Sequence, residues 1–126
     1  MQLAASSEAS AALFGQQGTD DPRTRILYYG IDLTPFEEEV DANALRSELG
    51  IPLDAFVVGH VGRFSTQKNH AFLVRVIEAL VAREPRTHAL LVGDGELRAA
   101  IEDDIRARGL SGHVTMTGVR PDVPRL

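Results

Sequence analysis

The sequence predicts an α/β domain in which a Rossmann-like parallel sheet is flanked by helices. Three short apolar runs, at residues 55–61, 88–92 and 113–117, have the continuous hydrophobicity of strands that are buried on both faces. Two stretches between these runs carry apolar residues at helical spacing. Strand, helix, strand, helix and strand joined by short loops are typical of a parallel sheet with helices on both sides.

The first part of the chain is predicted to belong to something else. Residues 7–14 have the pattern of a short helix, and the polar residues 15–23 that follow have the composition of a linker. Residues 1–24 are therefore interpreted as the end of an N-terminal domain with its linker. The main domain is predicted at residues 25–126, beginning with a short strand at 25–29.

The helices of the main domain have recognisable ends. Asp41 can cap a helix that runs to residue 49. Pro85 and Gly109 end the two later helices, and a further helix is expected to begin near Asp122. The stripe of the first later helix consists of Leu73, Val76, Ile77, Leu80 and Val81. The stripe of the second consists of Leu97, Ile101 and Ile105.

Composition excludes several classes of function. The net charge of −5 does not favour nucleic acid as a partner. No apolar run approaches the roughly 20 residues that span a bilayer, and no basic secretory segment opens the chain. The chain has no cysteine, so it forms neither disulfides nor thiolate–metal sites. A cytoplasmic protein is the expectation.

Ligands of open parallel sheets bind beyond the carboxyl ends of the strands. Three glycine-containing loops occupy that edge, at residues 62–69, 93–96 and 118–122. Arg63 follows the first strand and Lys68 precedes the next helix, whose N-terminus itself favours anions. This arrangement predicts a diphosphate site. Lys68 is the only lysine beside 12 arginines, which reflects either an arginine-rich codon usage or a need for a compact ammonium there.

Other chemical motifs find little support. The best candidate for a G-x-G-x-x-G fingerprint places Arg98 at its last glycine, and no G-x-x-x-x-G-K-[ST] phosphate loop exists. No spaced pair of acids is suited to clamp a metal. His60 is interpreted as a hydrogen-bonded core imidazole, and His70 as lying near the ligand, in a cap or on the surface. His88 and His113 begin strands and are predicted to be structural.

Five segments together resemble the family-4 retaining glycosyltransferases of the GT-B fold, from the end of the N-terminal domain into the C-terminal domain. They are YGID at 29–32 with Phe36, VGHVGRF at 58–64, QKNH at 67–70, LVGDGEL at 91–97 and GVRPDV at 118–123. Residue 29 is Tyr where the family more often has Asn, which concerns the interdomain hinge. The family's spaced glutamate pair would follow Leu126, and its acceptor-binding domain would precede Met1.

The resemblance implies a nucleotide-sugar donor whose diphosphate lies on Arg63 and Lys68, which would stabilise the leaving diphosphate. The other implied donor-binding residues are Gly62, Gly93, Asp94, Gly95, Val119 and Arg120. It implies no cofactor and no metal. It also implies a glycan or lipid-linked acceptor, bound through the N-terminal domain, and an enzyme that can associate peripherally with the inner face of the membrane.

The resemblance leaves two alternatives open. One is a different enzyme on the same fold, such as a sugar-nucleotide epimerase or a phosphorylase-type enzyme. The other is a degenerate or non-catalytic Rossmann-like module. Under each reading these 126 residues look like one part of a larger protein. We expect them alone to be inactive and marginally stable.

Overall fold

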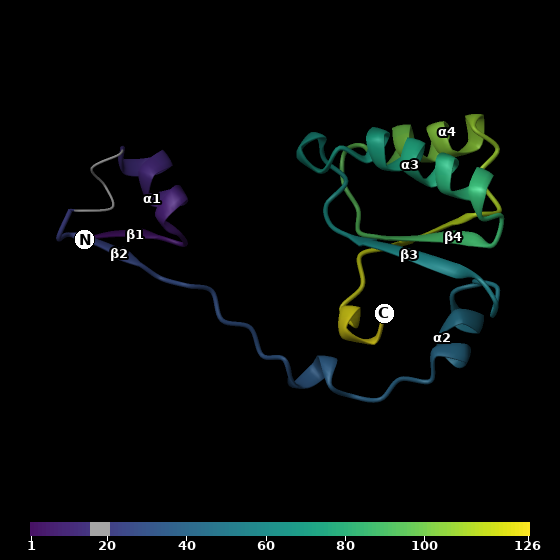
Figure 1. The fold of residues 1–126 in the computed structure, drawn as a ribbon, viewed down its shortest axis with the longest axis horizontal. Helices are drawn as coiled ribbons and strands as arrows, with labels where there is room; N and C mark the ends of the chain where they lie inside the picture. The colour runs from purple at the N-terminus through teal and green to yellow at the C-terminus, as the bar shows by residue number, and fades with distance from the viewer. Residues whose placement is uncertain (16–20) are drawn as a thin grey trace. The chain divides into compact units, whose positions relative to one another are not determined.

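A computed structural model describes residues 1–15 and 21–126 (Figure 1). The chain forms two compact units, Met1–Pro35 and Phe36–Leu126, and each is described by itself. The division falls between Pro35 and Phe36, whereas the sequence predicts a boundary after residue 24. Residues 16–20 of the predicted linker lie outside the described part.

The first unit is a helix on a pair of parallel strands. Strand β1 (Gln2–Ala4) pairs with β2 (Thr24–Ile26), and helix α1 (Ser7–Phe14) packs against both strands. The helix begins where the Ser6 hydroxyl accepts a hydrogen bond from the Ala9 amide, at 3.1 Å. The predicted helix at 7–14 is confirmed.

The predicted strand at 25–29 is wrong in its extent and in its place. It ends at Ile26 and pairs with β1 in the first unit, so it does not begin the main domain. The reason is that β1 was not predicted: three residues are too short for a periodic pattern. A side-chain hydrogen bond from Thr24 to Gln2, at 2.8 Å, reinforces this pairing.

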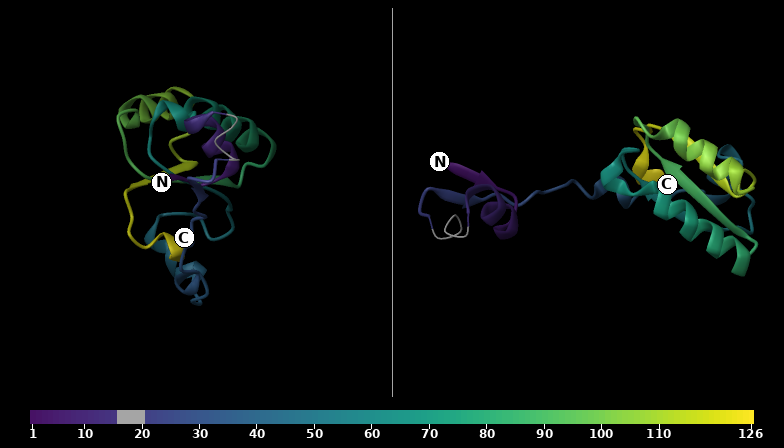
Figure 2. Two further views of the ribbon diagram at one scale, coloured as in Figure 1. Left: turned by 90° about the vertical axis from the view of Figure 1, so that its left-hand side faces the viewer. Right: turned by 90° about the horizontal axis from the view of Figure 1, so that it is seen from above.

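The second unit contains a parallel sheet in the order β3-β4-β5. Its strands are β3 (Phe56–Val61), β4 (Thr87–Val92) and β5 (Val114–Gly118). Helices α3 (His70–Arg83) and α4 (Arg98–Ala107) cover one face, and α2 (Ala42–Glu48) lies on the opposite face (Figure 1 and Figure 2). The predicted α/β class with a parallel sheet is confirmed.

The core is divided between the two faces of the central strand β4, in which every residue is buried. Ala89 and Leu91 pack with the apolar stripes of α3 and α4. Leu90 and Val92 pack with Ile51 on the opposite face, where α2 lies. Alternate residues of a strand point to opposite faces, so one strand serves both cores. This confirms the reading of residues 88–92 as a strand buried on both faces.

Strand β3 departs from that prediction. Phe56 is 58% exposed and Val61 is 55% exposed, although the run from 55 to 61 reads as fully buried. Among the described residues β3 pairs with β4 alone, so its other edge and part of its surface face solvent. A hydrophobic run indicates that a strand can be buried, but it does not identify the segment that covers the strand.

The ends of the helices follow the expected chemistry. The Asp41 carboxylate accepts hydrogen bonds from the amides of Asn43 and Ala44, both at 3.0 Å, and so caps α2. Helix α3 stops at Arg83, since a residue before proline disfavours helical geometry. After Asp122 a single 3-10 turn, Val123–Arg125, stands where the sequence predicts a helix.

Candidate functional site

The three predicted loops meet at the carboxyl edge of the sheet and are joined through their backbones. The Gly62 amide donates to the Val92 carbonyl and the Gly93 amide donates to the Gly118 carbonyl, both at 2.9 Å. The Phe64 amide donates to the Asp94 carbonyl at 2.9 Å. The loops after β3, β4 and β5 therefore form one connected surface.

Two glycines make this close packing possible. A Cβ atom on Gly93 would overlap the Gly62 carbonyl, and the φ angle of Gly93, +141°, is one that side chains rarely allow. A Cβ atom on Gly95 would lie 2.5 Å from the Phe64 carbonyl oxygen. The two loops can contact each other because these positions have no side chain.

A pocket of about 350 Å³ opens at this edge. It brings together six of the eight predicted donor-binding residues, and four valines supply much of its wall. Its lining consists of Val61, Gly62, Arg63, Val92, Gly93, Asp94, Val119, Arg120 and Val123. Lys68 and Gly95 are the two predicted residues outside this lining; Gly95 lies beneath it, against the backbone of Phe64.

The two predicted cations are both available to a ligand. Arg63 has a side chain that is 75% exposed, and its guanidinium lies 3.2 Å from the Glu96 carboxylate, which is also exposed. Such a solvated pair contributes little stability, so a phosphate can replace it at low cost. Lys68 is exposed and makes no ion pair with any described residue.

The side chain of Lys68 folds back toward the pocket. Its Cε atom lies 3.6 Å from the point where a Cβ atom of Gly62 would be, and Gly62 is the neighbour of Arg63. The 3-10 turn Thr66–Lys68 and the left-handed Asn69 reverse the chain before α3 and bring the lysine there. The ammonium and the guanidinium thus belong to one loop surface.

Arg120 lines the pocket, but its charge is already paired. Its guanidinium donates to both carboxylate oxygens of Asp122, at 2.9 and 2.6 Å, and to Glu48 at 3.0 Å. These hydrogen bonds raise the pKa of Arg120. The side chain is 19% exposed, so Arg120 contributes its backbone and aliphatic part more readily than a free charge.

The histidines divide into two groups. His88 and His113 are structural, as predicted, because His88 contacts the Thr115 hydroxyl at 2.9 Å and His113 the Thr87 carbonyl at 3.0 Å. His60 and His70 differ from expectation. His70 is 1% exposed and the cap position of α3 is Asn69, so neither the surface nor the capping role holds.

His60 is not the hydrogen-bonded core imidazole that the sequence suggests. It is only half-buried, its Nδ1 atom has no hydrogen-bond partner, and its ring lies against Gly62 at the edge of the pocket. The sequence signal that could have revealed this is the glycine two positions later, which leaves room for the ring.

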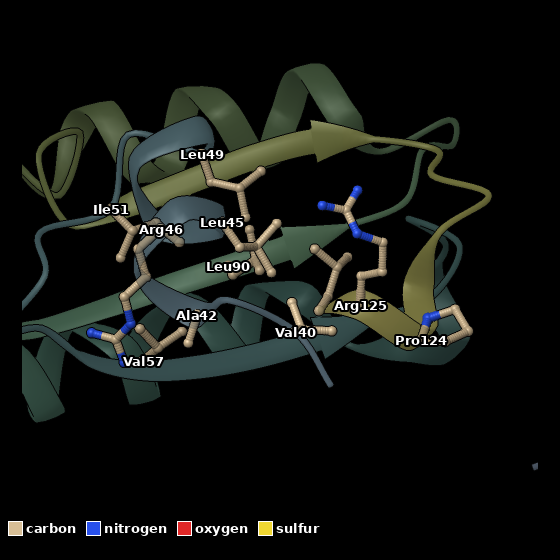
Figure 3. Close-up of a pocket in the computed structure, with 11 residues that line it drawn as sticks. Val40, Ala42, Leu45, Arg46, Leu49, Ile51, Val57, Leu90, Pro124 and Arg125 are labelled. Carbon is tan, nitrogen blue, oxygen red and sulfur yellow. The ribbon is translucent and has the colours of Figure 1, made fainter. Parts of the chain in front are cut away.

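A second pocket, of about 360 Å³, lies between α2, the sheet and the last residues of the chain (Figure 3). Figure 3 shows mainly aliphatic side chains around it, including Leu45, Leu49 and Leu90. The guanidinium of Arg46 is held by the carbonyls of Leu53 and Ala55, at 2.8 and 2.9 Å. This pocket gathers none of the predicted site residues.

Residues 1–15 and 21–126 contain no cluster of three or more His, Asp or Glu side chains that could hold a metal ion. Among the same residues, no helix has the length and apolar character required to cross a membrane.

A parallel α/β sheet with a glycine-lined pocket at its strand ends defines a ligand-binding domain of the Rossmann-like class. Comparison with known proteins gives the family. Residues 41–126 match the model of "Glycosyl transferases group 1", and this chain belongs to that family. The fold is that of the C-terminal domain of GT-B glycosyltransferases.

Individual relatives support this assignment. The chain is 35% identical over 124 residues to the Bacillus subtilis protein EpsF. The aligned residues make up 98% of this chain and 32% of EpsF. It is 28% identical to Anabaena HepE, which was solved in complex with UDP-glucose, with a TM-score of 0.82 over 98% of this chain and 34% of HepE. The chain thus spans about a third of these relatives.

A third comparison bears on the fold alone. WaaG, a glycosyltransferase involved in lipopolysaccharide biosynthesis, matches with a TM-score of 0.78 at 20% identity, over 98% of this chain and 34% of WaaG.

Proposed function

We propose that this chain is the donor-binding part of a retaining glycosyltransferase, which transfers a sugar from a nucleotide-diphosphate sugar to a glycan or lipid-linked acceptor. The observation that carries the proposal is the position of Arg63 and Lys68 beside a glycine-lined pocket at the strand ends. The complex of HepE with UDP-glucose supports a donor of this class.

The two cations suit a leaving diphosphate better than a passive ligand. A hydrogen bond to a charged group contributes about 1.5–3 kcal/mol, so two such bonds and a helix terminus give roughly 4–6 kcal/mol if they add. On their own they support an affinity near millimolar or weaker. They gain importance in the transition state, where negative charge grows on the departing oxygen and fixed cations stabilise it.

The remaining donor-binding residues would contribute in two ways. Gly93 and Gly95 let the loops after β3 and β4 pack against each other, and Gly62 lines the pocket without a side chain that would obstruct the nucleotide. Asp94, Val119 and the backbone of Arg120 would line the base and ribose. We propose that no metal or cofactor takes part, because the two cations would supply the charge that a metal ion supplies in other transferases.

The test compares two variants that each remove one exposed cation. Isothermal titration of the full-length protein with UDP, GDP and ADP identifies the preferred nucleotide. Lys68→Ala is expected to weaken that nucleotide about 10-fold or more, because a charged hydrogen bond is lost. Arg75→Ala removes an exposed charge from the middle of α3 and should leave the affinity within about two-fold of the parent.

The outcome that contradicts the proposal is also clear. A protein that binds a nucleotide diphosphate with the same affinity before and after Lys68→Ala does not use this loop as its phosphate site.

A further inference from the structure

Three aromatic rings pack together directly beneath the cationic loop. The ring of His70 meets His60 edge to face with centroids 4.8 Å apart, and it meets Phe64 edge to face at 4.7 Å. Phe64 is fully buried and His70 is 1% exposed. These rings come from the end of β3, from the loop and from the start of α3, so the cluster fixes the three parts against one another.

The cluster contains polar atoms without partners. The Nδ1 atom of His60 is buried without a hydrogen-bond partner, and both ring nitrogens of His70 are buried with no partner closer than a weak contact to the Ser65 backbone. An unsatisfied buried polar group costs about 1–3 kcal/mol, and each one in a native fold requires an explanation. A leucine or phenylalanine at either position would avoid that cost, so packing alone does not account for two imidazoles.

The remaining nitrogen of His60 lies beside Gly62, a residue that lines the pocket although His60 itself does not. From the point where a Cβ atom of Gly62 would be, His60 Cε1 is 3.2 Å away and His60 Nε2 is 3.8 Å away. The Cε atom of Lys68 is 3.6 Å from the same point. The imidazole edge and the lysine stem therefore converge over Gly62, which is part of the pocket.

The chain offers Nε2 of His60 no hydrogen-bond partner among the described residues, and this atom is not buried. Because Nδ1 is enclosed by the cluster, a neutral His60 gains most by carrying its proton on Nε2, where solvent or a ligand can accept it. The Nε2–H group then stands beside Lys68 as a second donor.

We propose that His60 is a further donor-binding residue, whose Nε2–H donates a hydrogen bond to the diphosphate held by Arg63 and Lys68. His70 acts as a positioning residue that holds the His60 ring in place. This inference rests on the proposed function, since it needs a phosphate in the pocket. It gives a reason for an imidazole at position 60 and for a glycine at position 62.

His70 is suited to a positioning role. Burial is the main cause that lowers the pKa of His70, and the neighbouring His60 and Lys68 lower it further against a contact with the Ser65 backbone that raises it. The ring is therefore neutral near pH 7, and it supports His60 without adding a buried charge next to the lysine. It begins α3, so its position is fixed by the helix.

The test uses three replacements that separate the two ring nitrogens. In His60→Gln the side-chain amide can reach the place of Nε2, and in His60→Asn it can reach only the place of Nδ1. His60→Phe keeps a ring but has no donor. If Nε2 binds the diphosphate, the Asn and Phe variants should lose about 10-fold in affinity for the nucleotide diphosphate, while the Gln variant stays within about three-fold.

A matched control removes a histidine from the far end of the sheet. His113→Asn keeps a donor near the position of Nδ1, which contacts the Thr87 carbonyl, and should leave nucleotide affinity unchanged. Titration with the nucleoside that lacks phosphates adds a second control, because the proposal predicts that its affinity does not depend on position 60.

Nitrogen-15 NMR of the histidine side chains in the unmodified full-length protein tests the same contact without any variant. We expect the Nε2 signal of His60 to shift when the nucleotide diphosphate is added and to stay in place with the nucleoside. An unchanged Nε2 signal, or a Phe variant that binds the diphosphate as well as the parent, overturns the role of His60. If Lys68→Ala still weakens binding, the proposed function survives that result; if no nucleotide binds the parent, both proposals fail.

Discussion

At Gly93 and Gly95 the missing side chains allow two loop backbones to touch, and this contact shapes the floor of the pocket. Gly93 has a φ angle of +141°, and any Cβ atom there would overlap the Gly62 carbonyl. The Gly62 amide and carbonyl thus face the loop after β4 closely, while His60 and Lys68 lie on the side of Gly62 where a Cβ atom would be.

Gly93→Ala is therefore expected to be strongly destabilising. The unfavourable backbone conformation alone costs about 1–3 kcal/mol, and relief of the overlap requires the loop at Gly62 to move. Urea unfolding of the full-length protein measures the loss, and Gly112→Ala is the matched control because a Cβ atom there meets open space. Equal stability of the two variants would show that the loops do not pack as described.

The positions of single residues can be predicted from the sequence where one residue type has one physical reason. The glycines, Arg63 and Lys68 stand next to strand ends, and the structure gathers most of the predicted set into one pocket. The prediction for His60 is wrong, and so are the cap and surface readings of His70, because an unpartnered nitrogen depends on what surrounds the ring. That information comes from packing across three segments and is absent from local pattern.

Ion pairs join separate elements around the loop after β5. Arg120 connects Asp122 on its own loop with Glu48 at the end of α2, and Arg125 lies 3.1 Å from Asp122. Hydrogen bonds from Arg120 are the main reason why the pKa of Asp122 is lowered, and the charges of Arg120 and Arg125 add to the effect. These contacts hold the wall of the pocket against α2.

Stability should respond to acid through this carboxylate. A group whose pKa is lowered by folding stabilises the native state above its unfolded pKa, and the contribution disappears as pH falls through the folded value. The difference in unfolding free energy between the parent and Asp122→Asn should therefore be constant from neutral pH down to about the ordinary value of 3.8, then shrink below it.

Denaturation of both proteins across a pH series measures this difference. Asp103→Asn offers a control on the surface of α4, where the carboxylate is 70% exposed and, among residues 1–15 and 21–126, forms its ion pair with Arg106 alone. If the difference in unfolding free energy between the parent and Asp122→Asn persists unchanged far below pH 3.8, the difference arises from packing and not from ionisation.

Elements were predicted with unequal success, for a physical reason. Amphipathic stripes and capping residues are local, so α2, α3 and α4 end close to where the sequence places them. The partner of a strand is a distant segment. The exposure of β3 and the pairing of β2 with β1 therefore contradict expectations that were drawn from hydrophobic runs alone.

At the scale of the whole molecule, the described fold corresponds to one part of its larger relatives. The chain covers about a third of EpsF and of HepE, so a donor site built from these residues alone would lack the contributions of the rest of such a protein. Apolar side chains also remain exposed on both units, among them Leu13 at 68% and Phe56 at 58%. Large exposed apolar groups are typical of surfaces that pack against further structure.

We therefore expect the 126 residues alone to transfer no sugar and to be marginally stable. Transfer requires an acceptor site and groups that act on the sugar, and the proposed cations meet only the diphosphate of the donor. The assay follows release of the nucleotide diphosphate from the preferred sugar donor, with the full-length protein as the positive control.

Hydrogen exchange on the same 126 residues should show rapid exchange in α1 and along the free edge of β3, because few apolar contacts protect them. Measurable transfer by these residues would place the whole reaction centre within one unit of the chain, and slow exchange in α1 would show that the first unit is stable without a neighbour.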